Sequence, residues 1–146
     1  MNHQLRPAVP DDQAQLWDIK RRCLRTYVEL TWGHWDEDIQ RARFDASFEP
    51  AEIQVISVAG VEVGYLAARR GAHEIQLLNL MIAPEFQRRG LGTAVLQDLR
   101  AEAQTRRVPI RLQVMKVNPA RRLYERLGFT VTEETVTHFR MRWSPA

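Results

Sequence analysis

The sequence predicts a mixed α/β fold in which helices flank one sheet, and three observations support this prediction. The chain has 146 residues and is 45% hydrophobic, which suits one domain with a single sizeable core. Two stretches with helical spacing of apolar residues come first, and β-branched residues dominate from residue 52 onward. No internal repeat, low-complexity tract or linker divides the sequence, so we expect a single domain over residues 1–146.

The first third of the chain is expected to hold an early strand and two helices. The strand fits residues 2–9, before Pro10. The run QAQLWDIKRRCLRTYVELTW then places apolar side chains at helical spacing, and Gly33 is expected to end this helix. The run DEDIQRARFDASF begins with acids that favour a helix N-terminus, and Pro50 should end the second helix.

The middle of the chain is expected to be mainly strand. The runs EIQVISVAG and VEVGYLAARR are rich in β-branched residues and meet at a turn around Ala59 and Gly60, which indicates a hairpin. A third strand is expected over residues 73–82. A helix that begins near Gly90 should close within residues 100–107, and VPIRLQVMKV then alternates apolar with polar residues as a strand does.

The last part of the chain predicts a short helix followed by a hairpin. The helix lies in NPARRLYERLGF, where Asn118 can cap it and Pro119 suits its first position. Gly128 suits the residue just past its end. The tail TVTEETVTHFRMRW has two strand-like halves, which we interpret as a closing hairpin.

Composition narrows the class of protein. The formal net charge is +3, and Lys20 and Lys116 are the only lysines. The excess of arginine fits phosphate recognition or a genome rich in G and C, and alone it favours neither nucleic acid nor nucleotide. Cys23 is the single cysteine, so we expect a reduced, cytoplasmic protein. The N-terminal segment has no basic stretch followed by an apolar run, so neither export nor membrane insertion is expected.

The stretch EFQRRGLGTAV, residues 85–95, is the strongest binding element in the sequence. A glycine-bearing loop between a strand and a helix leaves backbone N–H groups unpaired and directed outward, where anions bind. Gly90 and Gly92 let the backbone approach a phosphate closely, and Thr93 adds a hydroxyl donor. Two adjacent arginines add charged donors.

This loop differs from two other phosphate loops. A P-loop ends in Gly-Lys-Ser/Thr, which is absent here, and a dinucleotide loop needs a third glycine where Val95 stands. Taken alone, the loop is as compatible with a solvated turn before a helix as with an anion site.

Two motifs together indicate a family. The stretch IAPEFQRRGLGTAVL resembles the acyl-CoA-binding signature of the GNAT superfamily of N-acetyltransferases, Q/R-x-x-G-x-G/A. The stretch NPARRLYERLGF resembles the later motif of the same family. Both occur in the family order with a strand between them, and the resemblance covers residues 53–141. The matching positions are Gln87, Gly90 and Gly92 in the first motif, and Asn118, Tyr124, Gly128 and Phe129 in the second.

The resemblance implies a central, antiparallel-rich sheet flanked by helices, and an acetyl-CoA-dependent N-acetyltransferase that releases CoA. It implies that the pyrophosphate binds the loop amides and that the pantetheine arm pairs with the preceding strand. Strands 77–82 and 110–117 should splay apart around the thioester, with direct transfer of the acetyl group to the amine. The implied cofactor-binding residues are Leu80, Met81, Ile82, Gln87, Arg88, Arg89, Gly90, Leu91, Gly92, Thr93, Asn118 and Tyr124.

Tyr124 is the predicted catalytic residue. The tyrosine at its place in the family motif often lies beside the CoA sulfur, where a phenol can protonate the departing thiolate. The alternative is that Tyr124 only packs on the buried side of its helix. The resemblance also implies that a backbone N–H near Leu80 stabilises the oxyanion.

The general base stays open. Some family members carry a glutamate on the strand before the loop, and Gln76 takes that place here, with Glu74 one alternation away. Gln76 cannot accept a proton at neutral pH, so a base on this strand is in doubt. The other candidates are Glu29, His34, Asp36, His138 and a water chain.

The acceptor side is expected to come from the first two helices and the C-terminal hairpin. The run YVELTWGHWDED joins aromatic residues to carboxylates, which would suit a cationic amine. Alternatively, its aromatic residues fill the corner between the helices and its acids cap the second helix. The candidate substrate-binding residues are Tyr27, Glu29, Trp32, Trp35 and His138.

Two other functions are alternatives to an enzyme. A CoA-sensing module without turnover would explain the missing strand glutamate. A nucleic-acid binder is disfavoured, because the helical arginines lie among acids and no base-stacking motif accompanies them. We expect a small-molecule or peptide amine as partner, with no nucleic acid, no membrane and no metal. A homodimer could use Phe139, Met141 and Trp143, unless these side chains face inward.

Overall fold

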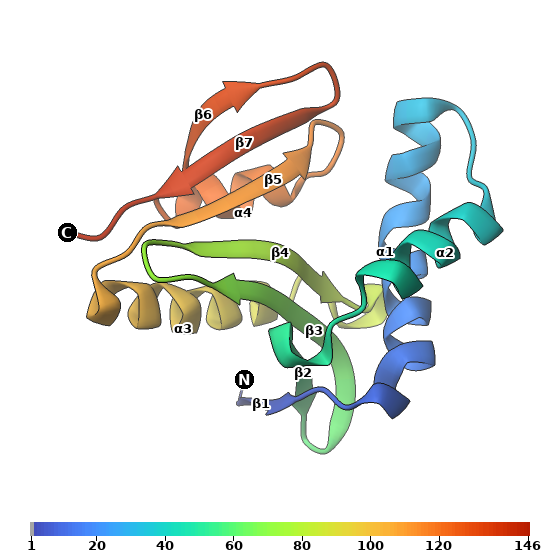
Figure 1. Ribbon diagram of the computed structural model, residues 1–146, viewed down its shortest axis with the longest axis horizontal. Helices are drawn as coiled ribbons and strands as arrows, with labels where there is room; N and C mark the ends of the chain where they lie inside the picture. The colour runs from blue at the N-terminus through green and yellow to red at the C-terminus, as the bar shows by residue number, and fades with distance from the viewer. Residues whose placement is uncertain (1) are drawn as a thin grey trace.

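The computed structural model describes residues 2–146, and seven strands form one sheet in the order β1-β2-β3-β4-β5-β7-β6 (Figure 1). All neighbouring pairs are antiparallel except β4 and β5, which are parallel. The strands are β1 (His3–Pro7), β2 (Ile53–Val58), β3 (Val61–Arg70), β4 (Ile75–Ile82), β5 (Ile110–Met115), β6 (Thr130–Glu134) and β7 (His138–Trp143). The helices are α1 (Gln13–Trp32), α2 (Glu37–Ser47), α3 (Leu91–Arg106) and α4 (Ala120–Arg126). The predicted mixed α/β fold is confirmed.

The helix boundaries follow the local signals in the sequence. Gly33 adopts a φ of 83° directly after α1, and the side chain of Asp36 caps α2 by accepting the N–H of Ile39 at 3.0 Å. The side-chain oxygen of Asn118 accepts the N–H of Ala120 at 2.9 Å, which caps α4 as predicted. A φ of 94° at Gly128 ends that helix region. These signals confirm the predicted end of α1, the acidic start of α2 and both ends of α4.

Two hydrophobic cores lie on opposite faces of the sheet. One core packs α3 and α4 against the sheet, and the other packs α1 and α2 against it. Phe139 and Met141 are 9% and 1% exposed within the α3/α4 core, and Trp143 packs against it. Phe139 and Met141 therefore face inward, as the alternative to a dimer surface required, and Trp143 is partly buried against the same core.

The feature that positions the site is a fork between β4 and β5. The two strands pair over three residues only, ending at Leu77 with Leu112, although both continue beyond this point. The β4 register against β3 shifts by one residue, because Ala67 pairs with Asn79 and Ala68 with Leu77. This leaves Leu78 as a bulge, which bends β4 away from β5 (Figure 1). The expected splaying of these strands is confirmed.

Gly64 holds β3 and β4 close together beside this fork. A Cβ at this position would collide with the backbone carbonyl oxygen of Met81. We therefore predict that Gly64→Ala lowers the free energy of unfolding by about 1–3 kcal/mol, measured by urea denaturation, since β4 must shift to make room. The matched change Gly71→Ala, whose Cβ would lie 3.3 Å from the Glu74 carbonyl oxygen, should cost less. Equal losses in the two variants would contradict this account.

Two kinds of feature are absent from the described residues 2–146. None of the helices in that range has the length and apolar character needed to span a bilayer. Within the same range, no group of three or more His, Cys, Asp or Glu side chains is arranged to hold a metal ion.

Candidate functional site

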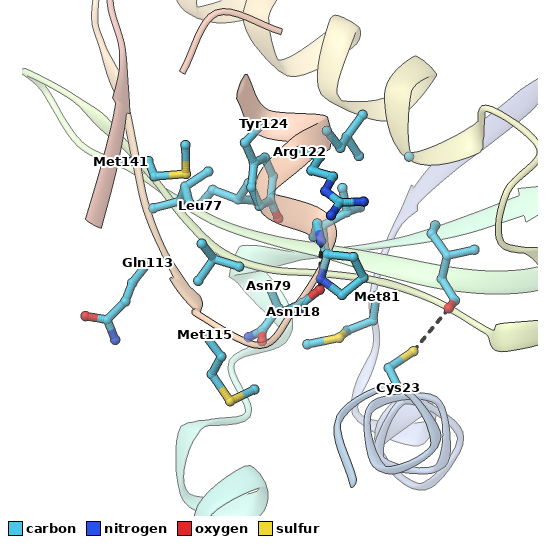
Figure 2. A pocket seen from close by; sticks show the side chains of 18 of the residues that line it. Cys23, Leu77, Asn79, Met81, Gln113, Met115, Asn118, Arg122, Tyr124 and Met141 are labelled. Carbon is cyan, nitrogen blue, oxygen red and sulfur yellow. Dashed lines mark hydrogen bonds between the residues drawn. The ribbon is translucent and has the colours of Figure 1, made fainter. Parts of the chain in front are cut away.

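A cleft of about 1240 Å³ opens where β4 and β5 part (Figure 2). Its walls come from α1, β4, the loop before α3, β5, α4 and the β6–β7 hairpin. Residues far apart in the sequence therefore meet in one concave site, as expected for a binding pocket. The predicted cofactor-binding residues that line it are Leu80, Met81, Ile82, Gln87, Arg88, Gly90, Leu91, Gly92, Thr93, Asn118 and Tyr124.

The edge of β4 presents backbone groups to the cleft. The N–H of Ala83 donates to the carbonyl of Val63 on β3 at 2.8 Å. Because backbone direction alternates along a strand, the backbone groups of Leu80 and Ile82 face the gap instead. The carbonyl of Ile82 accepts hydrogen bonds from Gln87 at 2.8 Å and from the Cys23 thiol at 3.1 Å. The remaining groups along this edge can pair with an extended chain that carries amides.

Cys23 is a structural thiol in this arrangement. Burial raises the pKa of Cys23 to about 11, so the thiol stays protonated at neutral pH. It donates to the end of β4, and the Gln87 amide donates to the same carbonyl. A protonated, hydrogen-bonding thiol is a poor nucleophile. This fits the expectation that Cys23 takes no covalent part in the chemistry.

The N-terminus of α3 lies at one end of the cleft. Gly90 precedes the helix with a φ of 78°, and the first backbone hydrogen bond of the helix runs from Ala94 to the Gly90 carbonyl at 3.0 Å. The N–H groups of residues 91–93 therefore precede the helical hydrogen bonds, and among residues 2–146 no side chain caps them. Gly92 has a second role, because a Cβ there would lie 3.3 Å from the Leu123 side chain.

Arginines surround the α3 end of the cleft, but they are not simply the two adjacent arginines of the loop. Arg88 lines the cleft with a φ of 63°, and Arg122 and Arg126 reach it from α4. Arg89 does not line the cleft, and its guanidinium lies 5.5 Å from the centre of the Phe86 ring. Arg122 and Arg126 were not predicted as site residues, because their placement depends on α4 packing beside the start of α3.

Tyr124 lies in the core and in the cleft at once. Its ring packs 5.7 Å from the Phe129 ring, and the side chain projects from α4 toward the fork (Figure 2). Burial raises the pKa of Tyr124 to about 12, so the hydroxyl is protonated at neutral pH. Tyr124 can therefore donate a proton or a hydrogen bond into the cleft, and it cannot act there as a base.

The structure divides the predicted acceptor-side residues. Tyr27 and His138 line the cleft from opposite walls, and Trp32, which is 50% exposed, lies with its ring 6.3 Å from the His138 ring. Trp35 instead stacks on Trp17 at 6.2 Å in the corner between the first two helices. Glu29 pairs with an arginine of its own helix and does not line the cleft. Trp35 and Glu29 therefore have structural partners away from the cleft.

His138 is the one candidate base that the fold brings to the cleft. Burial lowers the pKa of His138 below its ordinary value, so the imidazole is neutral at neutral pH. Its Nδ1 lies 2.7 Å from the Thr137 hydroxyl. Asp36 caps α2, and His34 contacts a backbone carbonyl of its own turn. Among the described residues that line the cleft, Glu133 is the only carboxylate, and it pairs with Arg140 at 2.9 Å.

Carboxamides take the place of acids at the fork. Asn79, directly after the bulge, lines the cleft from β4, and Gln113 lines it from β5 (Figure 2). Neither Asn79 nor Gln113 was predicted as a site residue, because each has the pattern of an ordinary outward residue of a strand. Their position at the point where pairing stops makes them part of the site.

A family model agrees with this geometry. The model described as "Acetyltransferase (GNAT) domain" matches residues 49–131. The [Ribosomal protein bS18]-alanine N-acetyltransferase of Salmonella typhimurium is 47% identical over 58 residues, which cover 38% of this chain. The matched region spans only 39% of that relative's length.

Solved structures resemble the whole fold at low sequence identity. The PaiA N-acetyltransferase of Thermoplasma acidophilum, in complex with coenzyme A, has a TM-score of 0.79 at 17% identity and covers 99% of both chains. The ribosomal-protein-S18-alanine N-acetyltransferase of Escherichia coli has a TM-score of 0.72 at 22% identity and covers 99% of this chain and 95% of its own. At such identities the likeness establishes the fold alone.

Proposed function

We propose that this chain, which belongs to the acetyltransferase (GNAT) domain family, is an N-acetyltransferase that uses acetyl-CoA and a primary amine. The observation that carries the proposal is the fork between β4 and β5, with the α3 N-terminus at one end and Tyr124 inside it. The α3 N-terminus would bind a pyrophosphate, the open edge of β4 in the fork would bind an amide-bearing arm, and Tyr124 would contact a sulfur. The observed fork fits the group that the family implies.

The protein groups that would hold the coenzyme follow from the cleft. Acetyl-CoA supplies an activated thioester, whose C–S bond breaks as the amide C–N bond forms. The N–H groups of residues 91–93 and the Arg88 side chain would bind the pyrophosphate, because a helix N-terminus and a guanidinium both favour anions. The free backbone edge at Leu80 and Ile82 would pair with the pantetheine amides.

The chemical roles follow from the protonation states of the lining residues. A backbone N–H near Leu80 would stabilise the charge that develops on the acetyl oxygen, since it is fixed in place before the reaction. The protonated hydroxyl of Tyr124 would donate to the departing sulfur. The same burial that raises the pKa of Tyr124 would also raise the pKa of a thiol beside it, since desolvation disfavours both anions. The neutral His138 would accept a proton from the acceptor ammonium.

The role of His138 predicts a pH dependence. Since burial lowers its pKa, His138 gains the proton only below its ordinary pKa of about 6.5, so kcat/KM should fall as the pH drops through that region. In His138→Gln this acid limb should disappear, and kcat/KM at neutral pH should fall by about 10²-fold. The measurement is the pH profile of CoA thiol release.

A matched change separates this role from a general effect of losing an imidazole. His34→Gln alters a histidine that contacts the Trp32 carbonyl and does not line the cleft, so its profile should match that of the unmodified chain. If His138→Gln keeps both the rate and the acid limb, a water chain must perform the deprotonation instead.

The test of the function itself combines binding with turnover. Acetyl-CoA at 100 times its Kd should stabilise the folded chain by about 2.7 kcal/mol and raise the melting temperature. CoA thiol release should then be measured over polyamines, amino acids, aminoglycosides and peptides with free N-termini. No thermal shift at millimolar acetyl-CoA would reject coenzyme binding altogether. A shift without thiol release from any amine would favour the alternative of a CoA-sensing module.

A further inference from the structure

Outward side chains of three neighbouring strands form a polar surface on the sheet face opposite α3 and α4. On β5, Ile110, Leu112 and Val114 are buried against those helices, so the alternating Arg111 and Gln113 point to the other face. On β7, Phe139 and Met141 face the same core, so Arg140 points with Arg111 and Gln113. We call this surface the arginine platform, and its residues are Gln76, Arg111, Gln113 and Arg140, all of which line the cleft.

The platform begins where the fork opens. Gln76 of β4 pairs with Arg111 of β5 just before the pairing of these two strands ends. Gln113 is the first residue of β5 beyond that pairing, and on the other side of β5 it pairs with Arg140 of β7. Met115 and His138 form another pair two residues farther along. Two strand residues span about 7 Å, so the platform and the proposed base lie within reach of one small molecule. An amine at the fork would have the rest of its molecule over this surface.

Each arginine of the platform pairs with one carboxylate from outside the platform. Arg140 pairs with Glu133 at 2.9 Å, and Arg111 pairs with Glu74 at 3.4 Å. The four side chains are between 45% and 55% exposed, so these pairs are weak and can exchange partners. A guanidinium has five N–H donors. Arg140 donates to Glu133 and, at 3.5 Å, to Gln113, and Arg111 contacts Glu74, so both arginines keep donors for a second anion.

The rest of the cleft disfavours a second cation on the acceptor. Of the five arginines that line the cleft, Arg111 and Arg140 lie on the platform, whereas Arg88, Arg122 and Arg126 lie at the end formed by the α3 N-terminus. Glu133 is the only carboxylate among the described lining residues, and it is already paired. An acceptor with a second ammonium would meet like charges without an unpaired acid to receive it, which costs affinity.

We propose that the arginine platform binds a carboxylate of the acceptor, so that the preferred acceptor is an amine with a carboxylate within about 7 Å of its reactive nitrogen. This inference rests on the proposed function and names the acceptor class of the same site. A free amino acid and a peptide with an acidic residue next to its N-terminus share this chemistry. A polyamine lacks it.

The experiment compares acceptors of matched length. 4-Aminobutyrate, butylamine and putrescine place a carboxylate, a methyl group or an ammonium at the far end of similar chains. We expect kcat/KM for thiol release to fall in that order by about tenfold or more per step, the change that about 1.4 kcal/mol produces. Tetrapeptides with Glu, Gln or Lys as the second residue form a second series. If the carboxylate raises kcat/KM in only one series, that series shows whether the acceptor is a small amine or a peptide. Equal rates in both series, or a preference for cations in both series, would overturn the proposal.

Variants of the chain locate the preference on the platform. Arg140→Gln should remove most of the gain for the carboxylate, and Arg140→Glu should reverse the order of the three amines. Arg43→Gln, at an exposed arginine of α2 outside the cleft, should leave the order unchanged. Acetyl-CoA thermal shifts in each variant show whether it is folded. An unchanged order in folded Arg140→Gln would overturn the assignment.

A binding measurement keeps the inference distinct from the proposed function. With CoA present, calorimetry should show that 4-aminobutyrate binds more tightly than putrescine, even if the chain has no turnover. If the coenzyme binds but thiol is never released, the proposed function fails. The relative affinities of 4-aminobutyrate and putrescine would still show which class of amine the cleft binds. If putrescine binds as tightly, the inference fails whatever the turnover.

Discussion

Replacing Tyr124 by phenylalanine should lower kcat by about 10²-fold while leaving the affinity for acetyl-CoA nearly unchanged. The change removes only the hydroxyl, and the ring keeps its packing 5.7 Å from Phe129. The loss should therefore fall on the step in which the sulfur departs and not on coenzyme binding. Steady-state rates give kcat, and calorimetry gives the affinity.

Tyr27→Phe is the matched control for this prediction. Tyr27 also lines the cleft, but from α1 and across from α4. Losing its hydroxyl should alter KM for the amine more than kcat, because Tyr27 lines the acceptor side of the cleft. Because burial raises the pKa of Tyr124 to about 12, the unmodified chain should show no alkaline limb attributable to this residue below about pH 10. An unchanged kcat in Tyr124→Phe would assign the residue to the core alone.

Replacing Gly90 by valine should abolish the thermal shift caused by acetyl-CoA. Gly90 has a φ of 78°, a conformation that costs a residue with a Cβ about 1–2 kcal/mol. Relaxation of this strain would move the first turn of α3, and with it the N–H groups proposed to bind the pyrophosphate. Losing two charge-assisted hydrogen bonds of about 1.5 kcal/mol each would raise Kd by about 100-fold.

Gly60→Val supplies a control with the same strain at another place. Gly60 has a φ of 80° in the β2–β3 turn, and a Cβ added there would meet no atom within 4 Å, as at Gly90. Both variants should lower the melting temperature of the free chain, but only Gly90→Val should lose the response to acetyl-CoA. A full thermal shift in Gly90→Val would remove the loop from the proposed coenzyme site.

Local signals explain which parts of the fold were predictable. The Asn118 cap, the glycine past α4 and the turn at residues 59–60 each depend on residues close in sequence, and the structure confirms them. The bulge at Leu78 gave no such signal, because the surrounding run LLNLMI is apolar toward both faces of the sheet. Its position becomes visible only through the pairing of β4 with β3.

The acceptor side was less predictable because it depends on distant packing. Trp32 and Trp35 lie three positions apart in one aromatic run, yet one faces His138 and the other stacks on Trp17. Arg111 and Arg140 have the pattern of separate surface residues on two strands. They become neighbours only because β7, and not β6, lies beside β5. No local pattern encodes that order.

The short ladder between β4 and β5 leaves two unpaired strand edges in the interior of a sheet. Open edges normally invite pairing with other polypeptides and lead to aggregation. Here α1 and α4 wall the opening, so a foreign strand with side chains on both faces would meet them before it could pair. A slender guest with amides along its length and without a strand's side chains meets no such obstacle. The walls of the cleft thus protect the two unpaired strand edges sterically. The same walls restrict which molecules can pair with these edges.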